Sequence, residues 1–336
     1  MPEKITRPRM GVGRDHVPVA ADASVLGTNA AMLSRMPPLS ILERMRLRPE
    51  TRGQRNEVML DQLVAANATE GGAPLRLLVM VAHPDDEAIG AGALLGRYPH
   101  ATVAHLTDGG GVEETTAIAR GFSSRSEYAA ARRAEVLAAL SIVGIPAHRI
   151  RSLGIPDGEA ASRLVESSRV IMELLDDAQP DVVLTHPYEG GHSDHDATAF
   201  GVHLAAGILG REGGRAPVIL ELTSYHHANG ERIRGQFIAR DGVRVRTLVL
   251  DDQARARKIQ MFERFSSQRD VVGKFPVHVE RFRVAPRYLF TEAPHQGVLD
   301  YERFCVRITG SEWRASAARA LEMLRARKRS GRREVT

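Results

Sequence analysis

Cysteine is almost absent from this sequence of 336 residues, in which Cys305 stands alone. A single cysteine excludes a disulfide within the chain and a cluster of several thiolates around a metal. The segment YERFCVRI (301–308) alternates polar and apolar residues, which predicts a strand. We therefore expect Cys305 to be a small buried hydrophobic residue and not a nucleophile.

Long apolar runs are also missing. No segment approaches the roughly 18 consecutive apolar residues that a membrane-spanning helix needs. The N-terminus, MPEKITRPRMGVGRDH, lacks the apolar core of a secretory signal. We expect a protein with no membrane span and a cytoplasmic location.

The net charge is +5, and much of the basic excess lies in RARKRSGRREV (325–335). Such a run can contact nucleic acid or an acidic membrane surface, or it can be the solvated end of a helix. We favour the solvated helix end, which is the commoner case, and expect no nucleic-acid partner.

Regular periodicity begins only near residue 73. Residues 1–72 contain short amphipathic pieces, such as LSILERMRL (39–47) and RNEVMLDQLVAAN (55–67), separated by proline, glycine and arginine. They predict an N-terminal extension with short helices and a linker. Strand-length apolar runs then alternate with helical periodicity, which indicates an open, mostly parallel α/β sheet. We divide the chain into this extension, a main domain (73–310) and a basic C-terminal helix or tail (311–336).

The individual elements follow from periodicity and from flanking breakers. Strands are expected at 75–82, 101–107, 149–156, 181–186 and 218–226, and helices at 86–97, 126–144, 162–179 and 251–266.

Two polar clusters follow predicted strands. HPDDE (83–87) comes directly after the first strand, and HPYEGGHSDHD (186–196) begins where the strand at 181–186 ends. Open α/β sheets bind ligands at the carboxyl ends of their strands. We therefore expect the two loops to face each other across one crevice.

The residue types in these loops suit a catalytic zinc, which takes three His or carboxylate ligands and keeps one position for water. His83 and Asp86 are three residues apart around the start of a helix and can reach a common point. His195 can supply the third ligand. Fe²⁺ suits the same two-His, one-carboxylate set, so the residues leave the metal open.

Neighbouring residues offer acid–base chemistry. Asp85 lies beside a ligand and is free to take a proton from the water that the metal activates. His192 can share the edge of the site, and Asp194 can hold its ring and raise its pKa. An imidazolium there would stabilise an oxyanion and protonate a leaving amine, as amide hydrolysis requires.

Each cluster alone has another interpretation. HPDDE could simply begin a helix, since Asp suits the N-cap and the first turn, and a lone pair of histidines is often solvated. Two unrelated caps would seldom carry five His and Asp residues at these spacings, which favours the metal site. His186 or Asp196 could close that site as a fourth ligand in a non-catalytic protein.

At these residues the sequence resembles the LmbE-like, or PIG-L, de-N-acetylases. AHPDDE (82–87) matches the first motif of the family, and HSDH (192–195) matches its H-x-D-H motif with Ser193 in place of the usual proline. The resemblance extends over about 75–272. It includes weaker matches at Arg132-x-x-Glu135, Lys258 and Ser267-Gln268.

The resemblance implies a Rossmann-like three-layer fold with zinc on His83, Asp86 and His195. It also implies Asp85 as general base and His192 as acid or oxyanion stabiliser. The resemblance also implies the removal of acetyl groups from N-acetylglucosamine-like conjugates, although some members of the family cleave other amides. We therefore expect a hydrolase of a small N-acetylated sugar conjugate, compatible with a homo-oligomer.

Three further residues are candidates for binding the substrate. Asp108 ends the second strand in LTDGGG, Arg132 lies on a helix, and Asp157 lies in the loop IPDG. Each also has a structural interpretation, as a turn cap or a solvated side chain. Nothing in these loops identifies the substrate.

Other function classes fit less well. Gly90, Gly92 and Gly96 resemble a dinucleotide fingerprint, but they fall inside a helix past the turn that would hold a pyrophosphate. We expect their small size to allow close helix–sheet packing or an open path to the metal. A non-catalytic metal- or sugar-binding protein would need neither Asp85 nor His192. Phosphoryl hydrolysis remains open chemically, but no P-loop or second metal cluster is visible in the sequence.

Overall fold

The computed structural model describes residues 49–65, 75–211, 215–304 and 307–331. Its centre is a seven-stranded sheet in the order β3-β2-β1-β4-β5-β9-β8. The first five strands are parallel, and β9 and β8 join them antiparallel. The strands are β1 (Leu77–Val81), β2 (Thr102–Thr107), β3 (Ile150–Ile155), β4 (Val182–Thr185), β5 (Val218–Leu222), β8 (Val245–Val249) and β9 (Val279–Val284).

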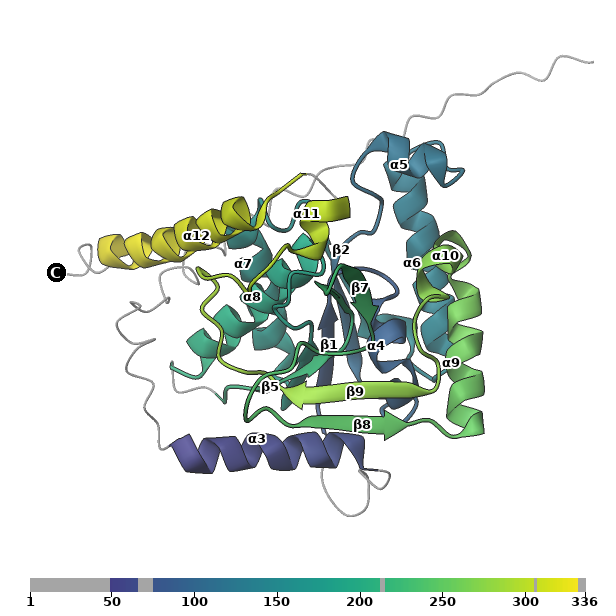
Figure 1. Cartoon of the computed structure of the whole chain (residues 1–336), viewed down its shortest axis with the longest axis horizontal. Coiled ribbons are helices and arrows are strands. Elements are labelled where there is room, and N and C mark those ends of the chain that lie inside the picture. Colours follow the sequence, from purple (N-terminus) through teal and green to yellow (C-terminus); the bar gives the residue numbers. More distant parts are fainter. Residues whose placement is uncertain (1–48, 66–74, 212–214, 305–306, 332–336) are drawn as a thin grey trace, which may run out of the picture.

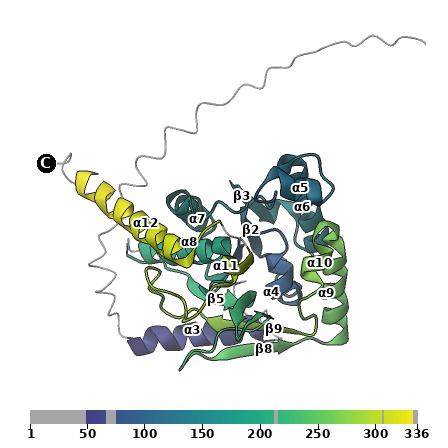
Figure 2. The same ribbon diagram turned by 45° about the horizontal axis from the view of Figure 1, so that its top comes forward.

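Helices cover both faces of this sheet (Figures 1 and 2). One face carries α4 (Asp86–Leu95), α6 (Arg125–Ser141), α9 (Asp252–Arg264) and α3 (Pro49–Val64), and the other carries α7 (Leu164–Ala178), α8 (Ser193–Leu209) and α12 (Gly310–Gly331). Shorter helices are α5 (Glu114–Ala119), η2 (Ala147–Arg149), η3 (Ser266–Gln268), α10 (Arg269–Val272) and α11 (Asp300–Phe304). The expected three-layer, mostly parallel α/β fold is confirmed. None of the helices in the described ranges is long and apolar enough to cross a membrane.

The sequence of β1, LLVMV, explains its central position. All five side chains are buried. Leu77, Val79 and Val81 belong to the core on one face, whereas Leu78 and Met80 belong to the core on the other. Side chains of a strand alternate between the two faces, so a continuous apolar run marks a strand that is covered on both sides.

Two expected strands are wrong in part. The segment 218–226 is divided between β5 and β6 (Tyr225–Ala228), and β6 pairs with β7 (Glu231–Arg234) in a separate hairpin. Asn229 and Gly230 both have positive φ, at 53° and 87°, as a two-residue hairpin turn requires. The expected strand at 301–308 is also wrong, because it starts within α11, and Cys305 lies outside the described residues.

Segments from outside the predicted main domain pack on it. Leu60 and Leu63 of α3 are buried in the core, and Asp61 pairs with Arg244 and Arg246 at 2.8 and 3.0 Å. The C-terminal helix α12 is buried through Trp313, Ala317 and Ala320. The expected helical piece at 39–47 lies outside the described residues, and the domain boundaries stay a prediction.

The helix α4 carries a kink at Ala91, where φ is −146°. Glu280 of β9 accepts hydrogen bonds from the backbone N–H groups of Ala93 and Leu94, and Lys258 donates to the carbonyl of Ile89 at 2.8 Å. The Lys258 and Glu280 side chains are fully buried and paired at 2.7 Å. This ion pair satisfies backbone groups near the kink.

The glycines of α4 allow the close packing expected from the sequence. A Cβ added at Gly90 would lie 2.6 Å from the side chain of Leu222 in β5, and one at Gly92 would lie 3.3 Å from Met261 in α9.

We expect Lys258→Met to lower the free energy of unfolding by about 3 kcal/mol, because Glu280 would be buried without its cation. The double variant with Glu280→Gln should recover part of that loss. Urea unfolding measures the stability of both variants. The control is Lys274→Met at an exposed position, which should change the free energy of unfolding by less than about 0.5 kcal/mol. Equal losses at positions 258 and 274 would contradict the assigned role of the pair.

Candidate active site

The pairing of two parallel strands brings the two motif loops together. β1 pairs with β4, with Leu77 opposite Val182 and Met80 opposite Thr185. Both strands therefore end at the same edge of the sheet, where ligands of such folds bind. HPDDE follows β1 and HPYEGGHSDH follows β4, so the two loops lie next to each other.

His83, Asp86 and His195 converge at this edge. Asp86 begins α4, and His195 lies in the first turn of α8. Nδ1 of His83 is 3.3 Å from one Asp86 oxygen and 3.2 Å from Nε2 of His195. That Nε2 is 3.3 Å from the other Asp86 oxygen. Ligand atoms at about 2.0–2.1 Å from a tetrahedral zinc would stand about 3.3–3.4 Å apart, so the spacing fits a metal ion.

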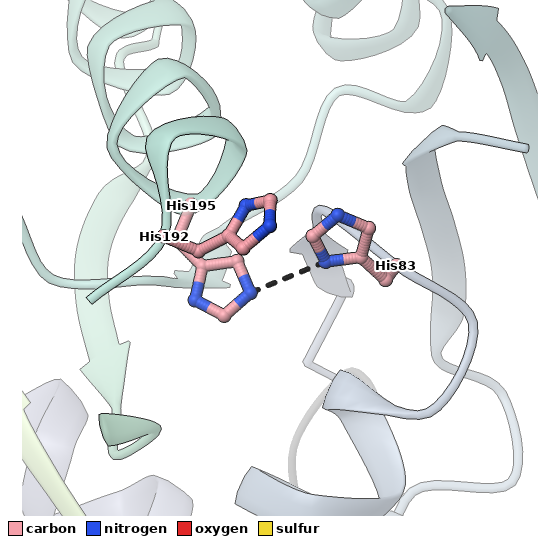
Figure 3. Close-up of side chains that lie close together, drawn as sticks. All are labelled: His83, His192 and His195. Atoms are coloured by element: carbon pink, nitrogen blue, oxygen red, sulfur yellow. Dashed lines mark hydrogen bonds between the residues drawn. The ribbon is translucent and has the colours of Figure 1, made fainter. Parts of the chain in front are cut away.

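His192 lies beside this set. Figure 3 shows His192 and His195 projecting from one end of α8 toward His83 on the opposite loop. The rings of His83 and His192 meet edge to face with centroids 4.6 Å apart. One nitrogen from each of the three histidines lies within 4.8 Å of the others. His192 therefore belongs to the same cluster of histidines as the two predicted ligands His83 and His195.

Buried carboxylates surround His83. Its Nε2 lies 3.2 Å from Asp157 and 3.4 Å from Asp194. Burial disfavours the charged ring, but the carboxylates of Asp157, Asp194 and Asp86 raise the pKa of His83 well above its usual value. The surplus of negative charge favours a cation at this position, which a proton or a metal ion can supply.

Asp85 occupies the turn between β1 and α4 with a φ of 147°, in the range that favours glycine. Such backbone conformations cost about 1–3 kcal/mol and concentrate at functional sites. The Asp85 carboxylate pairs with Nη2 of Arg132 at 3.1 Å. Burial raises the pKa of Asp85 to about 7, against the opposing effect of Arg132. A group with such a pKa can accept and return a proton near neutral pH.

The expected pairing of Asp194 with the His192 ring is wrong. The Asp194 carboxylate accepts hydrogen bonds from the backbone of Gly158 at 2.7 Å and Ala160 at 3.2 Å. Nδ1 of His192 accepts the backbone N–H of Asp194 at 3.1 Å. Burial and the nearby His83 lower the pKa of His192 to about 4, so the expected rise in its pKa is also wrong. The His192 ring is neutral near pH 7.

Comparison with known protein families identifies the region that carries these loops. The family model of the GlcNAc-PI de-N-acetylases, PIG-L, matches residues 78–206. The chain contains a PIG-L domain. This span holds both motif loops and the strands that position them.

Two curated bacterial proteins resemble parts of the chain. The 1D-myo-inositol 2-acetamido-2-deoxy-alpha-D-glucopyranoside deacetylase 2 of Catenulispora acidiphila is 28% identical over 172 residues, covering 44% of this chain and 56% of that protein. The deacetylase of the same substrate from Kineococcus radiotolerans is 29% identical over 192 residues, covering 47% of this chain and 53% of that protein. The chain thus aligns with about half the length of these relatives.

One solved structure supports the fold. A deacetylase from the teicoplanin biosynthetic pathway, crystallised as a triple mutant, superposes with a TM-score of 0.50 and 20% sequence identity. The match covers 63% of this chain and 98% of that chain.

The three predicted substrate residues lie within the PIG-L domain and contact other protein groups. Asp108 accepts hydrogen bonds from the backbone N–H groups of Gly110 at 2.9 Å and Asp157 at 3.1 Å, which stabilises its turn. Arg132 is paired with Asp85, and Asp157 lies against a candidate ligand. Arg132 and Asp157 therefore belong to the surroundings of the candidate metal centre, and contact with a substrate stays a prediction for all three.

Glu87 and His105 support the turn that holds Asp85, a role that the sequence did not predict. Glu87 accepts the backbone N–H of Asp85 at 3.1 Å and lies 2.9 Å from Nε2 of His105. Both side chains are buried. A sequence signal existed, because Glu87 belongs to the HPDDE motif and His105 is a polar residue inside an apolar strand.

His186 contacts the ligands but has another partner. Its ring stacks on His195 with centroids 3.9 Å apart, and its Nε2 accepts the backbone N–H of Ala82 at 3.0 Å. That lone pair is therefore already in use. Asp196, the other candidate fourth ligand, accepts the backbone N–H of Gly190. His186 also forms, with Asp86 and His195, a buried group whose ligand atoms lie within 4.8 Å of one another and could hold a metal. A fourth ligand from His186 therefore stays a prediction.

Residues beyond the PIG-L match also reach the centre. Ser224 Oγ lies 3.4 Å from Nδ1 of His195, and the ring of Tyr225 lies 5.5 Å from the His195 ring, centroid to centroid. No local pattern could have identified them. Ser224 lies in the break between β5 and β6, and Tyr225 begins the β6–β7 hairpin, so both reach the site only through the tertiary fold.

The close approach of this hairpin depends on Gly191, because a Cβ there would lie 2.0 Å from the carbonyl oxygen of Tyr225. We expect Gly191→Ala to lower the free energy of unfolding by about 1–3 kcal/mol. The matched control is Gly207→Ala inside α8, where a Cβ meets only the end of the Arg211 side chain at 3.4 Å, and should be neutral or stabilising. Urea unfolding measures the stability of both variants. Equal stabilities of Gly191→Ala and Gly207→Ala would contradict the steric constraint at Gly191.

Proposed function

We propose that this protein is a metal-dependent amide hydrolase that removes the acetyl group from the nitrogen of an N-acetylglucosamine-like conjugate. The observation that carries the proposal is the convergence of His83, Asp86 and His195 at the crevice, with Asp85 and His192 beside them. A protein that only bound a metal would need neither of the last two residues.

His83, Asp86 and His195 would hold the metal. The donor set suits Zn²⁺ or Fe²⁺, and the buried carboxylates near His83 favour a cation. When bound, the metal would supply an activated water and polarise the acyl carbonyl.

Asp85 is the proposed general base. Its place in the turn, directly before a ligand, puts a buried carboxylate at the edge of the site, and Arg132 holds it there. It would take a proton from the attacking water and return it to the leaving amine nitrogen. The products are then a carboxylate, acetate for an N-acetyl group, and a protonated amine, which together account for both protons of the water.

His192 is the proposed donor to the developing oxyanion. Because its Nδ1 accepts a backbone N–H, the proton of the neutral ring lies on Nε2. A neutral imidazole N–H is a good hydrogen-bond donor to an oxyanion. Asp194 acts less directly, since its carboxylate fixes the 158–160 turn and lies beside His83.

The proposed substrate class rests on the similar proteins. The two relatives are named as deacetylases of an inositol-linked acetamido sugar. An N-acetylated amino sugar in a small conjugate is therefore the first class to test, and a non-sugar amide is the alternative.

The activity test measures amine release from a panel of N-acetylated sugar conjugates and non-sugar amides, together with metal content. We expect release that a chelator stops and that added Zn²⁺ or Fe²⁺ restores. Bound metal without release from any amide would contradict the hydrolase, and an absence of bound metal after reconstitution would contradict the metal centre.

Asp85→Asn should lower turnover about 10²–10⁴-fold, the range typical of a lost general base, because the amide cannot accept the proton. Metal content should be unchanged, which elemental analysis of the purified variant checks. Full turnover by this variant would remove Asp85 from the role.

His195→Ala should lose metal and activity together. The matched control is His203→Ala, about two turns further along α8 and packed against Tyr288 and Phe290, which should keep its metal. A normal metal content in the His195 variant would exclude it as a ligand.

A further inference from the structure

The second motif loop lies against the C-terminal part of the chain. The Tyr188 hydroxyl donates to the carbonyl of Glu292 at 2.8 Å. The backbone N–H of Asp300 donates to the carbonyl of Gly190, also at 2.8 Å. The Trp313 indole makes a third contact with the loop. Three points of the loop are therefore joined to three residues of the C-terminal segment.

The Trp313 contact falls between two functional residues. Its Nε1 donates to the carbonyl of Ser193 at 3.1 Å, and Ser193 stands next to His192 and two residues before His195. Trp313 is fully buried and is the single tryptophan of the chain. A buried indole N–H that bonds here fixes the position of the first turn of α8.

Side-chain packing between the loop and the C-terminal segment accompanies these hydrogen bonds. The rings of Tyr188 and Trp313 lie 5.2 Å apart, centroid to centroid. Gly190 has a φ of 68°, and a Cβ there would lie 2.6 Å from the side chain of Leu299. The loop thus packs closely against this segment at Tyr188 and Gly190.

The opposite side of the loop has one other strong attachment. Glu189 pairs with Arg283 of β9 at 2.8 Å, and both side chains are buried. Further support for residues 188–193 comes from the Ile238 N–H, which donates to Glu189 at 2.9 Å, and from Gly191 packed on the Tyr225 carbonyl. The contacts to Glu292, Asp300 and Trp313 hold the loop from the side of the C-terminal segment.

We infer that the C-terminal segment defined by Glu292, Asp300 and Trp313, which we term the brace, positions His192 and His195 in the metal centre. The brace lies outside residues 78–206, which match the family model. The inference rests on the proposed function, because it assigns the brace to the geometry of the proposed metal site. Tyr188 and Trp313 are positioning residues, since they act through the loop.

Supporting residues around metal ligands typically change metal affinity by 10–100-fold when they are lost. Trp313→Phe keeps an aromatic ring but removes the N–H donor. We expect Co²⁺ to bind this variant about tenfold more weakly than wild type. We also expect the visible absorption bands of bound Co²⁺, which report the arrangement of its ligands, to change in position or intensity.

A milder pair of variants separates positioning from general stability. Tyr188→Phe removes one hydroxyl that donates to the carbonyl of Glu292 in the brace. Tyr98→Phe removes an equivalent hydroxyl, which donates to the carbonyl of Leu63 at 2.9 Å on the other side of the sheet. We expect weaker Co²⁺ binding, by roughly threefold to fivefold, and altered absorption for the first, with wild-type affinity and bands for the second.

The experiment titrates Co²⁺ into the full-length chain and its three variants, with melting temperatures measured in parallel. Altered bands and weaker binding at positions 188 and 313, but not at 98, support the brace. Wild-type bands and affinity in both Tyr188→Phe and a folded Trp313→Phe overturn the brace while the proposed function stands. If Trp313→Phe does not fold, the comparison of Co²⁺ affinity and absorption bands between Tyr188→Phe and Tyr98→Phe tests the brace. Wild-type protein that binds no metal overturns the metal centre, and the inference falls with it.

Discussion

The parallel pairing of β1 with β4 is the constraint on which the candidate site depends. Leu77 opposite Val182 and Met80 opposite Thr185 set where the two strands end. A slip of one residue would exchange the two faces of β1, moving Leu78 and Met80 into the core that Leu77, Val79 and Val81 now fill. Hydrophobic packing on both faces therefore fixes where His83 meets His195.

Buried charge then shapes the chemistry at that edge. Carboxylates inside a protein remain charged only with a positive partner or hydrogen-bond donors. Asp85 has Arg132, and Asp194 has two backbone N–H groups. Asp86 lies among histidines, which hold its pKa well below the usual value although burial opposes this. The centre is therefore prepared for a cation, and the strained backbone of Asp85 keeps a carboxylate beside it.

The fold and the convergence of His83, Asp86 and His195 could be predicted because their signals are local. His83 and Asp86 are three residues apart, and uninterrupted apolar runs flank each motif. The partner of Asp194 could not be predicted, since Gly158 and Ala160 lie 36 and 34 residues away along the chain and contribute only backbone N–H groups. Nothing local distinguishes Trp313, in a basic helix, from an ordinary core residue, because its partner is a carbonyl 120 residues away.

The hairpin is a different case. Asn229-Gly230 is a strong turn signal, yet the strand expected at 218–226 was continued across the polar residues Thr223 and Ser224 and concealed the hairpin. The short break at Thr223 and Ser224, which separates β5 from β6, determines that Tyr225 belongs to another sheet. Sequence periodicity alone does not show which sheet a strand joins, because that depends on contacts distant in the sequence.

The central claim is that two histidines and one carboxylate from the loops after β1 and β4 hold one metal ion. X-ray absorption spectroscopy of the zinc-loaded protein tests it most directly. The account predicts a low-coordinate shell of nitrogen and oxygen at about 2.0–2.1 Å, with the outer scattering of two imidazoles. A shell of six oxygens without imidazole scattering, or a zinc–sulfur distance of about 2.3 Å, would contradict it.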